Sequence, residues 1–225
     1  MKRLFIIAIM ALTILSLAAT GGVAYLSANK GKVDLTRDKK PVKFKSGQML
    51  NNEDVLTTGR ESFAAYKYVD GSSTVKVFAN SVVKIKAVAS GKKLSKTVAI
   101  SKGSVYSSVK KNKGSYKVDT PGTVASVKGT GFLTGVSDTD ETRYIVLDGI
   151  IEIEIKATGE KKDLPAGKTA TIDTDGNYTE YNSTEDELQD IQDLQDEAGM
   201  PLELKTMRIP VQNEAGQIKY IEIKY

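Results

Sequence analysis

The candidate chemical groups that lie close together in this sequence are oxygen-bearing side chains, which could bind a metal ion together. Residues 137–141 and 173–177 are both rich in oxygen ligands, which suit calcium. The second loop begins like an EF-hand loop but lacks the length and the terminal bidentate glutamate of that loop. An ordinary hairpin turn is therefore the favoured interpretation, and no metal ligands are predicted.

Paired carboxylates are the second candidate. Glu152 and Glu154 could serve glycoside hydrolysis, which uses two carboxyl groups on either side of the bond to be broken. They alternate with isoleucines, however, so we expect them on the solvent-facing side of a strand rather than in a cleft. Residues 128–131 are not a phosphate-binding loop, because the spaced preceding glycine and the following helix are missing.

Composition excludes most other active sites. The chain has no cysteine, histidine or tryptophan, so disulfides, thiolate nucleophiles, histidine bases and the usual zinc, copper and haem ligands are absent. No pair of nucleophile and base can be named. The prediction is a protein that is not an enzyme, with no cofactor and no small-molecule substrate.

Charge is distributed unevenly along the chain. The net charge is +4, yet residues 183–200 contain acids and no lysine or arginine. Mild basicity elsewhere suits anionic polymers or lipid head groups. Nucleic acid is not predicted as a partner, because no dense basic cluster with interleaved aromatic residues occurs.

The N-terminus indicates export. Lys2 and Arg3 precede an uncharged run over residues 4–28, which as a helix would reach roughly 37 Å and could cross a hydrocarbon core of about 30 Å. This run predicts a single-pass anchor in the inner membrane with the domain in the periplasm or outside. The alternative is a cleaved signal peptide and a secreted or periplasmic protein. Basic residues from Lys30 to Lys45 oppose this orientation, but the charge rule is weakest where a whole domain follows.

The elements that would position these residues are short strands. Between residues 33 and 179, apolar and polar residues alternate and are interrupted by turn-forming residues, which predicts an all-β domain. Three aspartate-glycine pairs, Asp70-Gly71, Asp148-Gly149 and Asp175-Gly176, are of the type that tight hairpins need. No long helix interrupts this region, so a parallel βαβ architecture is disfavoured.

The C-terminal segment has a different pattern. Ser183, with Asp186 three residues later, predicts the start of an acidic helix within residues 182–200. Residues 207–211 and 217–225 predict a hairpin. The last strand is a candidate interaction edge. Its candidate residues are Ile218, Tyr220, Ile221, Ile223 and Tyr225.

An ordered series of motifs runs through the β region. The most specific part is V-x-T-P at residues 118–121 followed by A-x-V-K-G-T-x-F at residues 125–132. The whole series resembles the FecR domain over roughly residues 33–172. The motif residues, all predicted to be structural, are Asp54, Gly59, Asp70, Gly71, Ser72, Thr120, Pro121, Gly129, Thr130, Phe132, Asp148 and Gly149. For Asp54, Asp70 and Asp148 we expect side-chain bonds to the backbone of their own turns.

The resemblance implies a β-roll or solenoid-like fold. Family members that control iron uptake engage a sigma factor through a cytoplasmic segment. Here that segment would be residues 1–3 alone, so this regulatory role is not predicted for the chain. The predicted organisation is a signal-anchor or signal peptide (1–28), a FecR-like β domain (29–179), and an acidic helix with a C-terminal hairpin (180–225). The predicted function is a non-catalytic protein-binding or signalling module of the bacterial cell envelope. The alternative is a structural or cell-wall and glycan-binding envelope protein.

Overall fold

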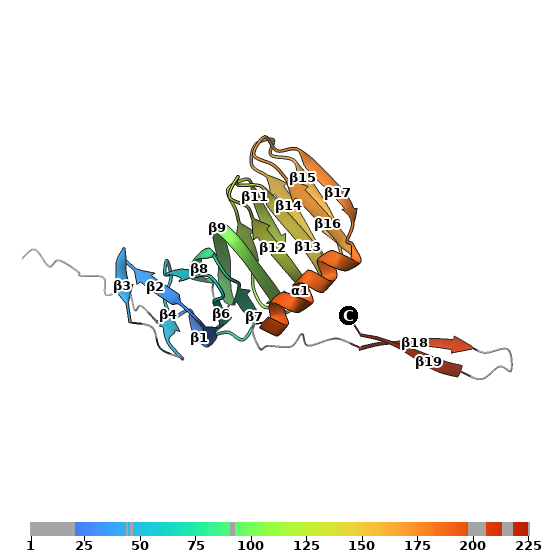
Figure 1. Cartoon of the computed structure of the whole chain (residues 1–225), viewed down its shortest axis with the longest axis horizontal. Helices are drawn as coiled ribbons and strands as arrows, with labels where there is room; N and C mark the ends of the chain where they lie inside the picture. The colour runs from blue at the N-terminus through green and yellow to red at the C-terminus, as the bar shows by residue number, and fades with distance from the viewer. Residues whose placement is uncertain are drawn as a thin grey trace, which may run out of the picture.

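The computed structural model describes residues 21–43, 45, 47–90, 93–197, 206–212 and 218–224. Within them the chain is mostly β, with one short helix near its C-terminal end (Figure 1). The all-β prediction is confirmed at this level. Most strands belong to one large mixed sheet that folds into two layers, which we call layer A and layer B.

Layer A is a run of neighbouring antiparallel strands. In spatial order these are β4 (Met49–Leu50), β1 (Ala24–Lys30), β6 (Phe63–Tyr68), β7 (Ser73–Val77), the second half of β9 (Lys93–Val109), β12 (Gly131–Val136), β13 (Thr142–Asp148), β16 (Lys168–Ile172) and β17 (Tyr178–Asn182).

Layer B lies behind layer A. In spatial order its strands are β3 (Lys40–Val42), β2 (Val33–Arg37), β5 (Val55–Thr58), β8 (Val82–Ser90), the first half of β9, β10 (Tyr116–Asp119), β11 (Thr123–Val127), β14 (Ile150–Ile155) and β15 (Lys161–Pro165). The pairing of β9 with β10 is parallel, and the other pairings in this layer are antiparallel.

Strand β9 joins the two layers. Its first half pairs with β8 in layer B and its second half pairs with β7 in layer A. Gly103 lies at the crossing with a φ of 88°. A Cβ there would lie 2.5 Å from the Cα of Ser81, so both the backbone angle and the close approach require glycine.

The main core lies between the layers. Alternation in β14 places Ile151, Ile153 and Ile155 inward and its glutamates outward, as the sequence predicts. Large aromatic side chains fill the same space, and Tyr66, Tyr68 and Tyr116 are almost completely buried. The ring of Tyr68 contacts those of Tyr66 and Tyr116 edge-on, at centroid distances of 5.7 and 6.4 Å.

Successive turns stack along one rim of the two-layered sheet. We call this line of turns the stacked rim; it comprises residues 70–72, 110–115, 129–130, 148–150 and 165–167. Neighbouring turns bond to one another: Lys110 N donates to Ser72 O at 2.8 Å, and Val109 N to Thr130 O at 3.0 Å. Thr130 Oγ1 donates to Ile150 O at 3.0 Å, and Ala166 N donates to Gly149 O at 3.0 Å. The rim thus satisfies backbone groups where the chain leaves its strands.

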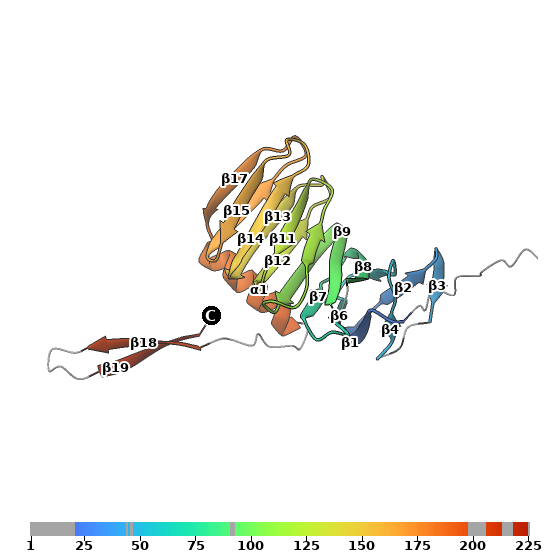
Figure 2. The same ribbon diagram turned by 180° about the vertical axis from the view of Figure 1, so that it is seen from behind.

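Helix α1 (Glu185–Glu197) lies on the outer face of layer A. Seen from behind, it lies on the far side of the strands (Figure 2). Ile191 packs into a second apolar cluster that includes Phe63, Phe78, Leu133 and Ile145. The acidic helix predicted from the sequence therefore exists, and it covers part of one sheet face.

The predicted helix cap is wrong by one residue. Thr184 and Glu187 form the capping box, with Thr184 N donating to Glu187 Oε2 at 3.0 Å and Glu187 N donating to Thr184 Oγ1 at 3.2 Å. Ser183 instead continues the pairing beyond β17, because its N–H bonds to Gly167 O at 2.9 Å and its hydroxyl contacts Thr169 Oγ1 at 3.0 Å.

The predicted membrane helix over residues 4–28 is wrong for residues 24–28. They belong to β1, which pairs with β4 and β6, and Ala24 and Leu26 face the core. The sequence hides this boundary because residues 21–28 carry no charge and so extend the apolar run. Residues 1–20 lie outside the described residues. In the described part of the chain, no helix is long and apolar enough to cross a membrane.

Two of the three predicted aspartate-glycine hairpins are confirmed. Asp70-Gly71 joins the paired strands β6 and β7, and Asp175-Gly176 joins the paired strands β16 and β17. The third prediction is wrong. Asp148-Gly149 joins β13 in layer A to β14 in layer B, so it turns a corner between layers rather than closing a hairpin.

The predicted C-terminal hairpin is confirmed by β18 (Thr206–Gln212) and β19 (Ile218–Lys224). These strands are antiparallel and form a separate two-stranded sheet. Four candidate edge residues, Ile218, Tyr220, Ile221 and Ile223, lie on β19, and Tyr225 lies outside the described residues.

Candidate functional site

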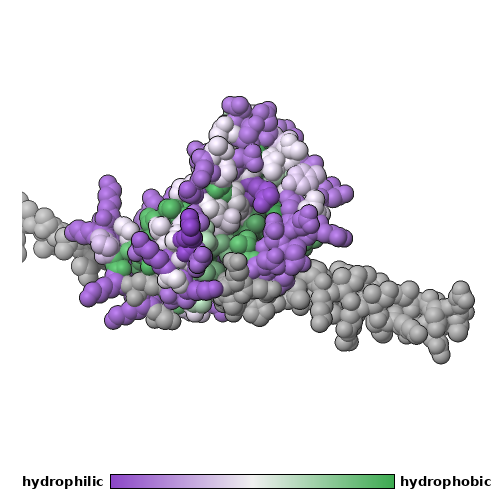
Figure 3. Space-filling view, in the orientation of Figure 1, coloured by the Kyte–Doolittle hydropathy of each residue, from purple (hydrophilic) through white to green (hydrophobic). Residues whose placement is uncertain are grey.

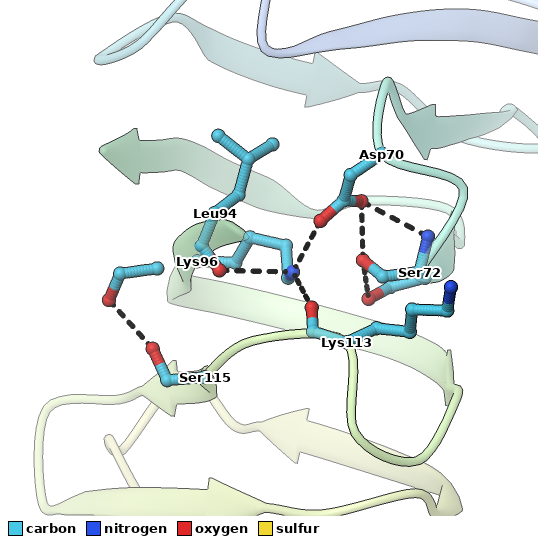
Figure 4. Close-up of polar contacts among 8 residues, drawn as sticks. Asp70, Ser72, Leu94, Lys96, Lys113 and Ser115 are labelled. Carbon is cyan, nitrogen blue, oxygen red and sulfur yellow. Dashed lines mark hydrogen bonds and ion pairs between the residues drawn. The ribbon is translucent and has the colours of Figure 1, made fainter. Parts of the chain in front are cut away.

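The most deeply buried basic group among the residues whose burial the structure describes is Lys96, on β9 (Figure 4). Its side chain is 1% exposed, and its Nζ lies 2.9 Å from Asp70 Oδ2. Nζ also donates to the carbonyl oxygens of Leu94 at 3.2 Å and Lys113 at 2.9 Å. These three acceptors match the three donors of an ammonium group. Nζ also lies 5.9 Å from the centre of the Tyr68 ring, within the range of a cation–π contact.

Asp70 is held as a carboxylate in this cluster. Burial acts to raise its pKa, but hydrogen bonds from Ser72 and Lys96 and the charge of Lys96 outweigh burial, so the pKa lies below its ordinary value. Ser72 N donates to Asp70 Oδ1 at 3.0 Å, which is the bond within its own turn that the sequence predicts. A lysine nucleophile must be reachable by its substrate, and Lys96 is enclosed with its donors occupied. The geometry is that of a structural ion pair.

A second ion pair joins β2 to the turn before β5. Arg37 Nε and Nη2 donate to the two carboxylate oxygens of Asp54, both at 2.8 Å, and Asp54 is completely buried. Asn51 N donates to Asp54 Oδ2 at 2.7 Å, as expected for a bond within its own turn. The hydrogen bond to Asp54 raises the pKa of Arg37. A bidentate contact of this kind fixes the relative position of the two side chains. It also means that these Arg37 donors and the Asp54 carboxylate oxygens are used within the fold.

Sequence reasoning missed both basic partners. The signal for Lys96 was available, because Lys96, Val98 and Ile100 are spaced two apart and therefore share one strand face. A lysine on an apolar strand face needs a buried acceptor. Arg37 offered no comparable signal, because its pairing with Asp54 depends on how β2 and the 51–54 turn meet in space.

Several motif residues meet at the stacked rim. The carboxylate of Asp148 accepts a hydrogen bond from Gly131 N on the facing strand β12, a contact that the prediction for its own turn did not include. Gly149 has a φ of 80°, and a Cβ there would lie 2.7 Å from Gly129 O. At Gly129 a Cβ would collide with the Lys111 side chain. These residues shape the corner at which β13 in layer A leads into β14 in layer B.

The other motif residues lie elsewhere. Thr120 and Pro121 form the turn between β10 and β11, where Thr123 N donates to Thr120 Oγ1 at 3.1 Å. The Thr120 hydroxyl also accepts from Thr142 Oγ1 at 3.0 Å. Phe132 is completely buried in the core. Gly59 follows β5, and its N–H bonds to Lys32 O at 2.9 Å.

The two oxygen-rich loops form turns that use their own oxygens. Asp173 Oδ1 accepts from Asp175 N and Asn177 N, both at 2.9 Å. Its pKa is lowered, chiefly by a hydrogen bond from the Asn177 side chain. Ser137 Oγ accepts from Glu141 N at 3.1 Å. Among the residues that the structure describes, no group of three or more acidic side chains is placed to hold a metal ion.

A cavity of about 270 Å³ lies between α1 and layer A. Leu133, Ile145 and Leu194 are among its apolar lining, and Asp190 and Asp193 are among its acidic lining. Figure 3 shows apolar side chains in green, bordered by hydrophilic ones, on the face of the molecule that it draws. The cavity therefore combines apolar and acidic side chains.

Glu187 fixes α1 beside this cavity. It accepts hydrogen bonds from Thr169 Oγ1 at 2.9 Å and Tyr181 OH at 2.8 Å, and it lies 3.6 Å from Arg143. Burial acts to raise its pKa, but hydrogen bonds from Thr184, Tyr181 and Thr169 and the charge of Arg143 outweigh it, so the pKa is lowered. The fold therefore holds Glu187 in its charged, carboxylate form.

Comparison with known proteins agrees with this picture of a structural β domain. Residues 54–152 match a family described as FecR protein. This match confirms the resemblance to the FecR domain seen in the sequence. Comparison with curated proteins finds no match.

Two solved structures share the fold. Both are crystal structures of a "putative anti-sigma factor" from Parabacteroides distasonis ATCC 8503, with TM-scores of 0.52 and 0.51 and 15% sequence identity. Each match covers 61% of this chain and 64% of the other, so the chain spans less than two thirds of the matched structures. At this identity the likeness concerns the fold alone.

Proposed function

We propose that this chain is a non-catalytic FecR-domain protein of the bacterial cell envelope that binds another envelope protein as a signalling or regulatory module. The FecR match and the fold shared with a "putative anti-sigma factor" support this class. The internal pairing of Lys96 with Asp70 and of Arg37 with Asp54 also favours a binding module over an enzyme. The stacked rim supports a β-roll of solenoid-like character for the domain.

The C-terminal hairpin is the observation that carries the proposal. Among the described residues, β18 and β19 pair only with each other. A two-stranded hairpin is at best marginally stable in water, and at least three strands or a packing partner are needed for independent stability. The outer edges of this hairpin also present unpaired backbone groups, which other strands bind readily. A partner strand would supply what the hairpin lacks.

The two edges of the hairpin are not equivalent. Pro210 on β18 lies opposite Tyr220 on β19. Opposite residues of antiparallel strands alternate between hydrogen-bonded and non-hydrogen-bonded pairs, and proline has no N–H to donate. We therefore assign Pro210 and Tyr220 to a non-hydrogen-bonded pair, with their backbone groups directed outward. Proline blocks the β18 edge, and β19 contains no proline, so β19 is the open edge.

The binding test compares one substitution on each edge. Arg208 and Glu222 lie opposite each other, two residues from the Pro210–Tyr220 pair, so Arg208 also has an outward backbone. Tyr220→Pro would remove an outward donor from the open edge, and the matched control Arg208→Pro would remove one from the edge that already contains proline. We expect Tyr220→Pro to abolish capture of envelope proteins by the full chain, with Arg208→Pro retaining it. Equal capture by both variants would contradict the strand-edge mechanism.

The proposed location is the outer side of the inner membrane. Its support is the apolar run that begins at Leu4 and continues through the first twenty residues. Protease added to intact spheroplasts should digest the β domain, whereas protection of the domain would place it in the cytoplasm. If the anchor is instead cleaved, the chain recovered from cells will be shorter than the full sequence.

A further inference from the structure

We infer that the N-terminal end of layer A rests on an anionic lipid surface. The protein surface that makes this contact consists of Tyr25, Met49, Lys67 and Val69, and we call it the entry patch. It lies where the chain passes from the apolar N-terminal run into the β domain. This inference rests on the membrane location proposed above.

The entry patch is unusually apolar for a solvent-facing surface. Tyr25 is 37% exposed, Met49 is 42% exposed and Val69 is 50% exposed. These three are half of the six large hydrophobic residues that are exposed among the residues up to position 194 whose burial the structure describes. Single exposed apolar residues need no explanation, but a group of them at one place marks an interaction surface.

The three side chains gather at one point of the fold. Strands β1 and β4 lie side by side (Figure 1). Their register places Tyr25 directly opposite Met49. Val69 N donates to Val23 O at 3.0 Å, immediately before β1. A Cβ at Gly22 would collide with the Met49 methyl group, so this side chain lies over the incoming chain. The patch therefore surrounds the first described residues.

The length of the connection determines how far the patch can lie from a membrane. Only residues 21–23 lie between residue 20 and the start of β1. Three extended residues span at most about 10 Å. If the run up to residue 20 lies in a bilayer, β1 must begin in or next to the head-group region. Tyrosine favours that region, because its ring is apolar and its hydroxyl remains hydrated.

Charge favours anionic lipids as the occupant. Lys67 lies opposite Tyr25 on the neighbouring strand, within the patch itself. Lys43 and Lys45 are exposed on the segment that leads to β4. The nearby Asp70 contributes little opposing charge, because its carboxylate is turned inward to Lys96. Basic residues next to a membrane segment are attracted to anionic head groups.

A single tryptophan can report on the entry patch, because the chain contains none. The full chain carrying Tyr25→Trp would be reconstituted in vesicles of phosphatidylglycerol and phosphatidylcholine with brominated acyl chains. The matched control is Ile150→Trp, which replaces an exposed residue on β14 in the other half of the sheet. We expect quenching of at least about twofold for the tryptophan at position 25, with a blue-shifted emission, and none at position 150. Adding Lys67→Glu should reduce the quenching in anionic vesicles more than in vesicles of phosphatidylcholine alone.

Each contrary outcome has a distinct meaning. An unquenched tryptophan at position 25, in a chain that stays with the vesicles through a carbonate wash, overturns the lipid contact and leaves the membrane location intact. A chain that washes off overturns the membrane location and this inference with it. A blue shift that grows with protein concentration, without quenching by bromine, shows that the patch pairs with a second copy of the chain and overturns the lipid contact.

Discussion

At the scale of single residues, Lys96 shows how the domain tolerates a charge in its core. The ammonium group has three acceptors, and one of them, Asp70, also binds the turn that begins β7. Removing one member of a buried pair leaves the other charge uncompensated, which typically costs about 3–5 kcal/mol. Lys96 is far more buried than Asp70, whose side chain is 20% exposed. The cost of breaking the pair should therefore depend on which partner is removed.

We expect Asp70→Asn to lower the free energy of unfolding by about 3 kcal/mol, because it leaves the Lys96 charge with carbonyl acceptors only. Lys96→Met should cost less, because methionine fills the space and Asp70 can reach water. The double variant should resemble Lys96→Met alone, with a coupling of about 1 kcal/mol or more. Denaturant unfolding of the four proteins measures this cycle, and simple additivity would show that the pair is not coupled.

The same pair contributes pH dependence. Because the pKa of Asp70 is lower in the folded state, its stabilising effect is present above its unfolded-state pKa and is lost as the pH falls through its folded-state pKa. We expect Asp70→Asn to flatten the loss of stability in acid. Thermal unfolding followed from neutral pH down to about pH 3 would detect this change. An unchanged acid slope would mean that other carboxylates dominate.

A comparison of two glycines separates the energetic cost of backbone strain from the cost of a steric collision. Gly71 and Gly149 both have positive φ, but a Cβ at Gly71 meets nothing within 4 Å, whereas one at Gly149 would lie 2.7 Å from Gly129 O. Gly71→Ala should cost about 1–2 kcal/mol from its left-handed conformation alone. Gly149→Ala should cost clearly more, because two turns of the stacked rim must move apart. Equal losses in chemical denaturation would mean that the contact at Gly149 relaxes freely.

At the scale of elements, α1 is attached to layer A by few side chains. Ile191 is 1% exposed, whereas Leu188 on the same helix is 40% exposed. We expect Ile191→Ala to lower the free energy of unfolding by about 2–4 kcal/mol, or to release the helix, and Leu188→Ala to cost less than about 1 kcal/mol. Limited proteolysis near residue 197 together with denaturant unfolding would separate these two effects. Similar behaviour of both variants would mean that the helix is not anchored through Ile191.

The strands could be predicted from the sequence because alternation is local. In β14 every second residue is an isoleucine, and no knowledge of its neighbours is needed to assign its two faces. The partners of each strand are not local. Asp148-Gly149 has the same residues as the hairpin turn at Asp70-Gly71, and the difference lies in which strands pair on either side. Sequence chemistry therefore predicted a turn there but not its kind.

The start of the domain was hidden by composition. Residues 24–28 are uncharged, so they extend the apolar N-terminal run, although Ala24 and Leu26 already alternate as strand residues do. The crossing of β9 between layers also escaped prediction, because Gly103 requires glycine only once Ser81 lies against it. In both cases tertiary contacts determine what the local pattern leaves open.

At the scale of the whole molecule, the two proposed interaction surfaces come from different parts of the chain. The entry patch lies where residues 21–23 lead into layer A, and the open edge belongs to β19, whose sheet is separate from the large one. Between them lies a β domain whose buried Lys96 and Asp54 are each paired within the fold. This organisation suits a module that is anchored at one segment and recognises a partner through another.

Amide hydrogen exchange of the full chain, free and bound to its captured envelope partner, tests the central claim most directly. The account predicts rapid exchange in the free chain at the outward amides of β19, those of Ile218, Tyr220, Glu222 and Lys224. It predicts protection of these amides in the complex, because a partner strand pairs with them. Unchanged exchange along β19, with protection appearing instead at α1 or on the outer face of layer A, would contradict it.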